Sequence, residues 1–453
     1  MSDVVILGAG PAGLVAAADA ARRGAAVTVL ERADVVGGMA ASFEVAGVRV
    51  DHGSHRFHPA ASEAAIGRVR SLLGDDLQER PRNGRLRLGG RWLSFPLQTT
   101  ELLTGTPPSF AVRAGIDAVA SPLRRPKADT YAQVVRAGLG PTVADRFHLP
   151  YARKLWGIDP EELSGELARR RVSAGSPLAI LRRLAATRGG RRPVFLYPRR
   201  GFGQIVDRLA DDAVEAGASI EVGVEVTDLR GGVVRTAGGA ELHPGHVWST
   251  IPPGVQARLS GAPADVLAAA ERVTFRGLVL VYLVVDRSQW TTFDAHYIAD
   301  DANPVSRLSE PKNYRDADDP TDRTVLCAEV PATVGDAIWT ASPDELRRLV
   351  VDALVSEGLP DPGPGDTEVR YLPRVYPVLT PAALADLETI AAWEDNDESV
   401  VSFGRPALAV PDNTHHVIDM GAAIATCLHD DGTFDRRRWA FQLDAFTTHV
   451  VED

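Results

Sequence analysis

A glycine-rich turn near the start of the chain restricts the fold more than any other feature. Residues 4–7 read Val-Val-Ile-Leu, and residues 8–13 then read Gly-Ala-Gly-Pro-Ala-Gly. The aliphatic run predicts a parallel strand that is buried on both faces. Pro11 suits the first turn of the alanine-rich helix that follows, because the N–H it lacks has no partner inside a helix. Gly24 ends that helix, and Val27–Leu30 predicts a second strand.

Each glycine of the turn has its own steric role in a dinucleotide site. Gly8 makes the tight turn, Gly10 lets the backbone approach a pyrophosphate, and Gly13 lets the helix pack closely on the strand. The free N–H groups at the helix N-terminus favour the phosphates. Glu31, at the end of the second strand, can accept both ribose hydroxyls. The predicted contacts in this unit are Gly8, Gly10, Pro11, Ala12, Gly13 and Glu31, with NAD and FAD both open.

Length, charge and cysteine content narrow the class of protein. A chain of 453 residues predicts two or three domains. The net charge of −11 argues against nucleic acid as a partner, because a phosphate backbone needs a basic face. The longest apolar run, Gly277–Val285, is too short to span a bilayer and predicts a buried strand. Cys327 and Cys427 lie far apart without CxxC spacing, so we expect a reducing cytoplasm and neither disulfide nor zinc.

The residues after Glu31 favour FAD over NAD. The segment Glu31–Ala40 begins Glu-Arg and contains Gly37-Gly38, and Asp51–His58 reads Asp-His-Gly-Ser-His-Arg-Phe-His. These segments resemble the FAD-dependent amine oxidase superfamily. Further segments resemble its protoporphyrinogen-oxidase-like and UDP-galactopyranose-mutase-like branch, at residues 88–97, 151–157, 197–204, 304–310 and 374–378.

The resemblance implies a set of cofactor contacts, and the sequence departs from the family pattern at one place. Phe403-Gly404-Arg405 and a helix from about Thr414 to Cys427 are similar to the C-terminal FAD motif, whose helix would face the pyrimidine edge of the flavin. The implied contacts outside the first unit are Arg32, Gly38, Met39, Gly53, Ser54, His55, Val226, Gly404, Asp412, Asn413 and Val417. The family continues Gly-Arg-x-Gly with aromatic residues, whereas Pro406–Val410 follows here. No single member's substrate is therefore carried over.

The predicted fold is α/β, with a Rossmann-type FAD-binding domain, βαβ with a β-meander, interleaved with an α+β substrate-binding domain. In the meander we expect strands at Ser219–Leu229 and His246–Thr250, with glycine turns at 231–232 and 238–239. The expected FAD-binding parts are 1–75, 195–265 and 395–453. The expected substrate-binding parts are 76–194 and 266–394.

Two side chains are the candidate catalytic residues. His55 lies in the segment that, by resemblance, lines the flavin, and imidazole can give or take a proton near neutral pH. Arg307 can pair with a carboxylate or phosphate of a substrate, or form a structural pair with a glutamate such as Glu310. His55 and His58 are only three residues apart without a third ligand, so no metal site is predicted. Arginine-rich runs at 80–91, 169–171 and 188–192 could steer an anionic substrate.

Three functions remain open at this point. The leading one is an oxidoreductase in which a small organic substrate loses a hydride to flavin N5, and electrons pass to dioxygen or another acceptor. The second is a UDP-galactopyranose mutase-like isomerase, which uses reduced flavin without net redox change. The third is an FAD-bound protein without catalysis. The expected partner is a small-molecule substrate, and the oligomeric state is open.

Overall fold

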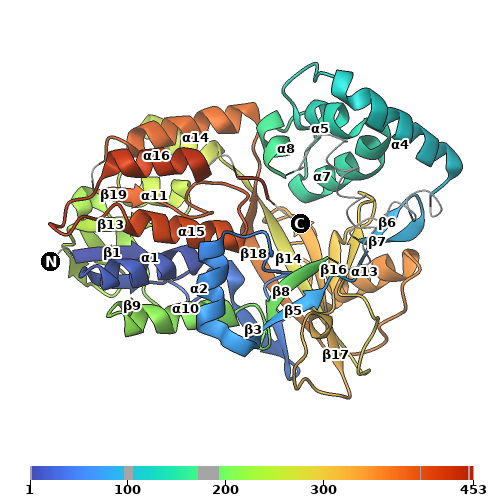
Figure 1. Ribbon diagram of the computed structural model, residues 1–453, viewed down its shortest axis with the longest axis horizontal. Coiled ribbons are helices and arrows are strands. Elements are labelled where there is room, and N and C mark those ends of the chain that lie inside the picture. Colours follow the sequence, from blue (N-terminus) through green and yellow to red (C-terminus); the bar gives the residue numbers. More distant parts are fainter. Residues whose placement is uncertain are drawn as a thin grey trace.

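A five-stranded parallel sheet forms the half of the molecule that begins with the N-terminus (Figure 1). The computed structural model describes residues 3–95, 101, 106–171, 193–397, 399–446 and 449–451. The sheet order is β19 (Val400–Ser402), β13 (His246–Ser249), β1 (Asp3–Leu7), β2 (Ala26–Leu30) and β9 (Ser219–Glu221), and every neighbouring pair is parallel. The predicted strand–helix–strand order is confirmed, because α1 (Pro11–Arg22) joins β1 to β2.

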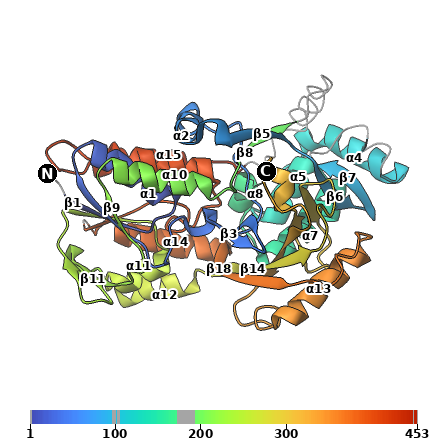
Figure 2. The same ribbon diagram turned by 90° about the horizontal axis from the view of Figure 1, so that it is seen from below.

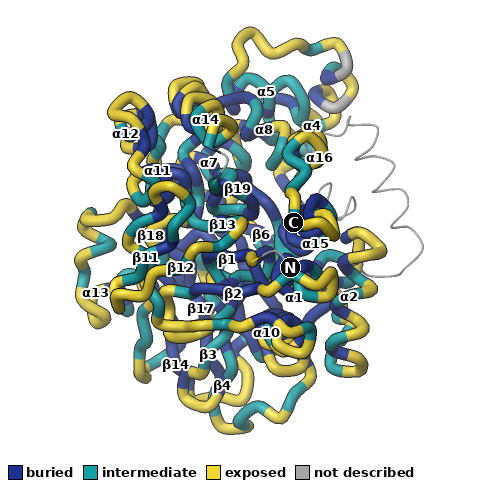
Figure 3. Tube along the Cα trace, turned by 90° about the vertical axis from the view of Figure 1, so that its left-hand side faces the viewer, coloured by how far each residue is buried: buried dark blue, intermediate teal, exposed yellow. Residues whose placement is uncertain are grey.

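Helices cover one face of this sheet, and a meander with further helices covers the other (Figure 2). α1 packs against α10 (Gln204–Glu215) and α15 (Thr414–Ala425). The second face carries α11 (Pro253–Leu259), α12 (Ala264–Arg272) and α14 (Pro381–Glu394). Both faces are therefore covered, and Figure 3 draws most of β1, β2 and β13 as buried. This explains why β1 and β2 are mainly aliphatic without alternation.

The meander differs from the prediction in two respects. It consists of β10 (Val226–Asp228), β11 (Val234–Thr236) and β12 (Glu241–Leu242). The prediction of one strand over Ser219–Leu229 is wrong, because Gly223 has φ +71° and separates β9 from β10, which lie in different sheets. The grouping of His246–Thr250 with the meander is also wrong, since β13 pairs with β1.

A seven-stranded sheet forms the second half of the molecule. Its order is β18 (Thr367–Pro377), β14 (Phe275–Val285), β17 (Thr324–Ala332), β16 (Arg307–Ser309), β15 (Ala295–Ile298), β6 (Gly84–Leu88) and β7 (Arg91–Phe95). The predicted buried strand at Gly277–Val285 is confirmed as β14. Alternate residues of β14 belong to two different hydrophobic clusters, so the strand is apolar on both faces.

The two faces of this sheet have different neighbours. One face packs on α13 (Pro343–Ser356), whose N-terminus is closed by a Ser342–Glu345 capping box. The other face packs on a hairpin from the first half of the molecule, β3 (Ser42–Val45) and β4 (Val48–Asp51). The chain segment that leaves β4 therefore starts where the two halves meet.

A layer of helices extends beyond the seven-stranded sheet (Figure 1). It contains α4 (Pro108–Ala120), α5 (Tyr131–Leu139), α6 (Pro141–Val143), α7 (Leu149–Trp156) and α8 (Gly165–Arg171). The remaining elements are α2 (Glu63–Leu73), β5 (Leu77–Pro81), β8 (Val194–Pro198) and α16 (Arg436–Phe446). The fold is thus a Rossmann-type domain interleaved with an α+β domain, and the boundaries expected within it stay predictions.

Candidate functional site

The glycine turn lies between β1 and α1 and is packed against backbone on one side. Gly8 has φ +102° and donates its N–H to the carbonyl of Leu30 at 2.8 Å. A Cβ on Gly13 would lie 2.1 Å from the carbonyl oxygen of Gly8. At Gly10, by contrast, an added Cβ would meet no described atom within 4 Å. The turn is therefore closed toward the sheet and open at Gly10.

The N-terminus of α1 faces this opening. α1 begins at Pro11, as predicted, and no described side chain caps it. Its first turn also contains no acidic residue. The N–H groups of Ala12 and Gly13 and the positive end of the helix dipole suit an anion such as a pyrophosphate.

Glu31 reaches back from the end of β2 to the glycine turn. Its Oε2 accepts the N–H of Ala9 at 2.9 Å, and its Oε1 accepts the N–H of Ala33 at 2.8 Å. Each carboxylate oxygen can accept a second hydrogen bond, so both remain able to bind ribose hydroxyls. Arg32, the next predicted contact, is exposed beside it.

A second glycine pair borders the same opening. Gly37 has φ +111° and donates its N–H to the carbonyl of Ala9 at 2.8 Å. A Cβ on Gly38 would lie 3.8 Å from the Cα of Gly10. Met39 follows Gly38 in the same short 3-10 helix, Gly38–Ala40. Val226 lies on β10 and packs against the hydrophobic cluster that contains Leu30. The structure thus brings the predicted contacts of 31–39 and Val226 to the end of β2.

The C-terminal segment closes onto α1 from another side. A Cβ on Gly421 of α15 would lie 2.4 Å from the carbonyl oxygen of Ala12, and one on Gly404 would lie 3.4 Å from the Cβ of Ala12. The predicted helix from Thr414 is confirmed as α15, although it ends at Ala425. Asn413 is its N-cap residue, and Val417 is buried in its first turns.

Asp412, directly before that N-cap, is a buried carboxyl with an open acceptor. It is 5% exposed, and its Oδ2 has no hydrogen-bond partner among the described residues. Burial raises the pKa of Asp412 to about 7, although the charges of Arg405 and Arg170 act in the opposite direction. An orphaned buried acceptor in the segment that closes onto α1 fits a ligand with hydroxyl donors, such as the ribityl or ribose part of FAD.

The loop after β4 carries the predicted flavin contacts Gly53, Ser54 and His55. Gly53 has φ +91°, and Ser54 donates its N–H to Oε1 of Glu329 at 2.8 Å. The His55 ring stacks on Phe202, and its Nδ1 lies 3.3 Å from the carbonyl oxygen of Gly53. Burial lowers the pKa of His55 to about 4, and the charge of Arg307 adds to that effect. His55 is therefore neutral at pH 7.

Arg307 lies on β16 and pairs with Glu329 on β17, not with Glu310. Its Nε and Nη2 donate to the two carboxylate oxygens of Glu329, each at 2.9 Å. Glu310 instead accepts the N–H groups of Trp290 and Thr291. Arg307 also lies over the Tyr297 ring, 5.8 Å from its centroid.

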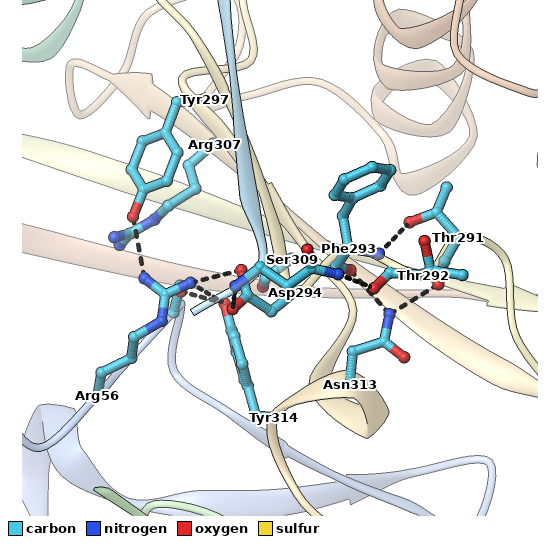
Figure 4. A network of polar contacts seen from close by, with 12 residues as sticks. Arg56, Thr291, Thr292, Phe293, Asp294, Tyr297, Arg307, Ser309, Asn313 and Tyr314 are labelled. Atoms are coloured by element: carbon cyan, nitrogen blue, oxygen red, sulfur yellow. Dashed lines mark hydrogen bonds and ion pairs between the residues drawn. The ribbon is translucent and has the colours of Figure 1, made fainter. Parts of the chain in front are cut away.

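A buried network next to Arg307 was not predicted from the sequence (Figure 4). Arg56 donates to Tyr297 Oη at 3.0 Å and to Asp294 Oδ1 at 3.1 Å, and it lies over the rings of Phe195 and Tyr314. An arginine between two histidines, in the segment that by resemblance lines the flavin, was the available signal.

The two histidines of the His-x-x-His segment are separated in the structure. His58 Nδ1 accepts the N–H of Ala60, whereas His55 packs on Phe202. Within the described ranges, one group has the spacing of metal ligands, Asp412, His416 and His449. His416 Nδ1 already accepts the N–H of Asn413 as part of the α15 cap. The arginine run at 188–192 lies outside the described residues.

These features together define a dinucleotide-binding protein of the Rossmann type, and comparison with known proteins gives the family. The profile of the family described as flavin containing amine oxidoreductase matches residues 11–377. The chain belongs to this family. It is an FAD-dependent oxidoreductase, and the open glycine turn, the uncapped helix and the orphaned Asp412 oxygen fit FAD.

Individual proteins resemble the chain in sequence or in fold. The chain is 26% identical to coproporphyrinogen III oxidase of Propionibacterium freudenreichii subsp. freudenreichii, over 94% of this chain and 89% of that one. It is similar in fold to reduced UDP-galactopyranose mutase, with a TM-score of 0.81, 20% identity and complete coverage of both chains. A proposed protoporphyrinogen oxidase from Exiguobacterium sp. 255-15 has a TM-score of 0.71 at 18% identity, with 94% of this chain and 99% of that chain covered.

In the described part of the chain, no helix combines the length and the apolar character needed to cross a bilayer.

Proposed function

We propose that the chain oxidises a small, anionic organic molecule by passing a hydride to FAD bound at the glycine turn. The observation that carries the proposal is the contact between the loop after β4 and the seven-stranded sheet. In that contact Ser54 donates to Glu329, which in turn holds Arg307. The loop that we propose to line the flavin thus lies against a guanidinium group suited to a substrate.

The anionic character of the substrate is inferred from two nearby arginines. Arg171, at the end of α8, lies over the rings of Trp156 and Tyr376, 5.4 Å from each centroid. Burial lowers the pKa of Arg405, and the positive charge of Arg171 lowers it further. A carboxylate or phosphate group between the two guanidinium groups would relieve their repulsion.

The chain's own residues then have separate parts in the reaction. FAD, when bound, supplies the acceptor for the hydride. His55 takes the proton that leaves the substrate with the hydride: its Nδ1 carries a proton toward the Gly53 carbonyl, so Nε2 holds the lone pair. Arg307 orients the substrate, and Arg171 and Arg405 bind its anionic group.

Anaerobic addition of candidate substrates to the FAD-loaded protein tests this proposal. Porphyrinogens, after the named relative, are compared with small amines and carboxylates. A compound that the enzyme oxidises reduces the bound flavin. The visible flavin band therefore bleaches, and an equal amount of product forms. Arg171→Met should raise KM for that substrate about tenfold, the loss of one charged contact of about 1.4 kcal/mol, without changing FAD content. Equal KM values in the two proteins would contradict the anion-binding role.

A second candidate is a mutase reaction on a sugar nucleotide, which uses reduced FAD without net oxidation. The fold agreement with reduced UDP-galactopyranose mutase, complete over both chains, favours it. Chemically reduced holoenzyme with a UDP-sugar separates the two candidates. An isomeric product without consumption of an electron acceptor supports the mutase, and product formed only with acceptor reduction supports the oxidase.

A further inference from the structure

Glu329 is a buried charge in the middle of an apolar strand. β17 reads Thr-Val-Leu-Cys-Ala-Glu-Val-Pro-Ala, and all nine residues are buried. Glu329 itself is 1% exposed. Burial removes the hydration of a carboxylate. This costs on the order of several kcal/mol unless charged and polar partners replace the water. The partners of Glu329 must therefore offset the cost of burying its charge.

The partners of Glu329 come from both halves of the molecule. Its Oε1 accepts the Ser54 N–H at 2.8 Å, and its carboxylate accepts Nε and Nη2 of Arg307 at 2.9 Å each. A Cβ on Gly53 would lie 3.2 Å from Oε1, so the loop approaches the carboxylate closely. One carboxylate therefore joins the loop after β4 to the guanidinium group on β16.

This arrangement fixes the position of the Arg307 guanidinium group and balances its positive charge. A bidentate pair holds the guanidinium plane in one orientation. It also cancels the charge of Arg307 toward its surroundings. The influence of the pair already reaches the loop: after burial, Arg307 lowers the pKa of His55 and Glu329 raises it.

We propose that Glu329 is a positioning residue that holds the Gly53–His55 loop against Arg307 and balances the charge of Arg307 beside the flavin. The inference rests on the proposed function, because it takes the flavin ring to lie at that loop. Reduction makes the flavin more negative, and a nearby positive charge favours the reduced form. Removing the charge of Glu329 leaves Arg307 unbalanced and should shift the flavin midpoint potential to a more positive value.

The test compares midpoint potentials of FAD-loaded variants by spectroelectrochemical titration. Glu329→Gln keeps the shape of the side chain and removes its charge, and Glu329→Asp keeps the charge. Glu357→Gln is the matched control, because Glu357 pairs with Arg87 at 2.8 Å in the same half of the molecule. We expect a positive shift for Glu329→Gln alone, with FAD still bound.

A second pair of variants separates electrostatics from folding. Arg307→Gln leaves the carboxylate unbalanced and should shift the potential to a more negative value, and the double variant with Glu329→Gln should return it toward wild type. If Glu329→Gln does not fold, the Arg307→Gln shift decides the matter.

Two results would overturn the inference in distinguishable ways. Unchanged potentials in flavin-loaded Glu329→Gln or Arg307→Gln reject the role of Glu329 and leave the proposed function standing. A wild-type protein that takes up no FAD rejects both.

Discussion

Gly13 packs directly against Gly8: a Cβ on Gly13 would lie 2.1 Å from the carbonyl oxygen of Gly8. This contact joins the first turn of α1 to the end of β1, and it leaves no room for a methyl group. Gly13→Ala should therefore destabilise the fold by at least about 2 kcal/mol, as overpacking does, and should weaken FAD binding as well. Urea denaturation and flavin content measure the two effects.

Gly10→Ala is the matched variant and should behave differently. Gly10 has φ −77° and ψ 175°, which alanine adopts readily, and no described atom lies near its added Cβ. We expect the free energy of unfolding to stay within about 1 kcal/mol of wild type, because alanine takes the backbone conformation of Gly10 without strain. FAD affinity should fall at least about tenfold, since the added methyl group would occupy open space where we propose that the pyrophosphate binds. Equal flavin content in Gly10→Ala and wild type would remove the turn from the site.

Glu31→Ala should weaken FAD retention. The variant loses the acceptor proposed for ribose and also the hydrogen bonds from Ala9 and Ala33 that shape the turn. Loss of hydrogen bonds to a charged group corresponds to about a 10- to 100-fold lower affinity. The exposed Asp34, three residues later, is the control, and Asp34→Ala should bind FAD as wild type does. Equal dissociation constants for the two variants would contradict the ribose role.

The locally determined elements of the fold were predictable from sequence. Gly8–Gly13 and the flanking aliphatic runs predict a strand–helix–strand unit, because a few adjacent residues determine each strand, turn and helix. The α15 helix was predicted to start at the observed residue, Thr414. The apolar run of β14 was predicted as a buried strand for the same local reason.

Sheet partners and the charge network depend on distant residues and were not predictable in the same way. His246–Thr250 reads as a strand, but nothing local tells that it pairs with β1. Gly223 could have marked the break between β9 and β10, since a positive φ there ends the strand. Glu329 gave a usable signal as a lone charge in an apolar run, although its partners Ser54 and Arg307 are fixed only by tertiary packing.

Asp51 should be a second residue, besides Glu329, that holds the loop after β4 in place. It is 3% exposed and accepts hydrogen bonds from Ser42 Oγ, Tyr197 Oη and the N–H of Phe202. Asp51→Ala leaves these buried donors without a partner and should cost about 2–4 kcal/mol of unfolding free energy. Tyr197→Phe removes one donor and should cost about 1 kcal/mol. A smaller loss for Asp51→Ala than for Tyr197→Phe in thermal or urea denaturation would contradict this assignment.

His296 should make stability depend on pH below neutrality. It is 1% exposed among Trp92, Trp290 and Phe293, and its Nε2 lies 2.9 Å from Arg85 Nη2. Burial, and then the charge of Arg85, lower the pKa of His296 to about 3. The unfolded chain therefore binds a proton that the folded chain does not between about pH 6.5 and 3, so stability falls as pH falls through this window.

Replacement of His296 should flatten that dependence. One proton contributes at most about 1.4 kcal/mol per pH unit, and His296→Gln should remove this part of the slope. The exposed His243 is the control, so His243→Gln should keep the wild-type slope. Urea denaturation between pH 7 and 5 measures it, and equal slopes for all three proteins would reject a neutral buried His296.

The direct test of the central claim is calorimetric titration of the flavin-free protein with FAD and with NAD. FAD bound at the glycine turn, with its ring at the Gly53–His55 loop, predicts one FAD per chain and a visible flavin band that changes on binding. It also predicts that NAD binds far more weakly, because the single nicotinamide ring of NAD buries less surface at that loop than the three-ring isoalloxazine of FAD. Equal binding of the two nucleotides, or no uptake of FAD, would contradict the account.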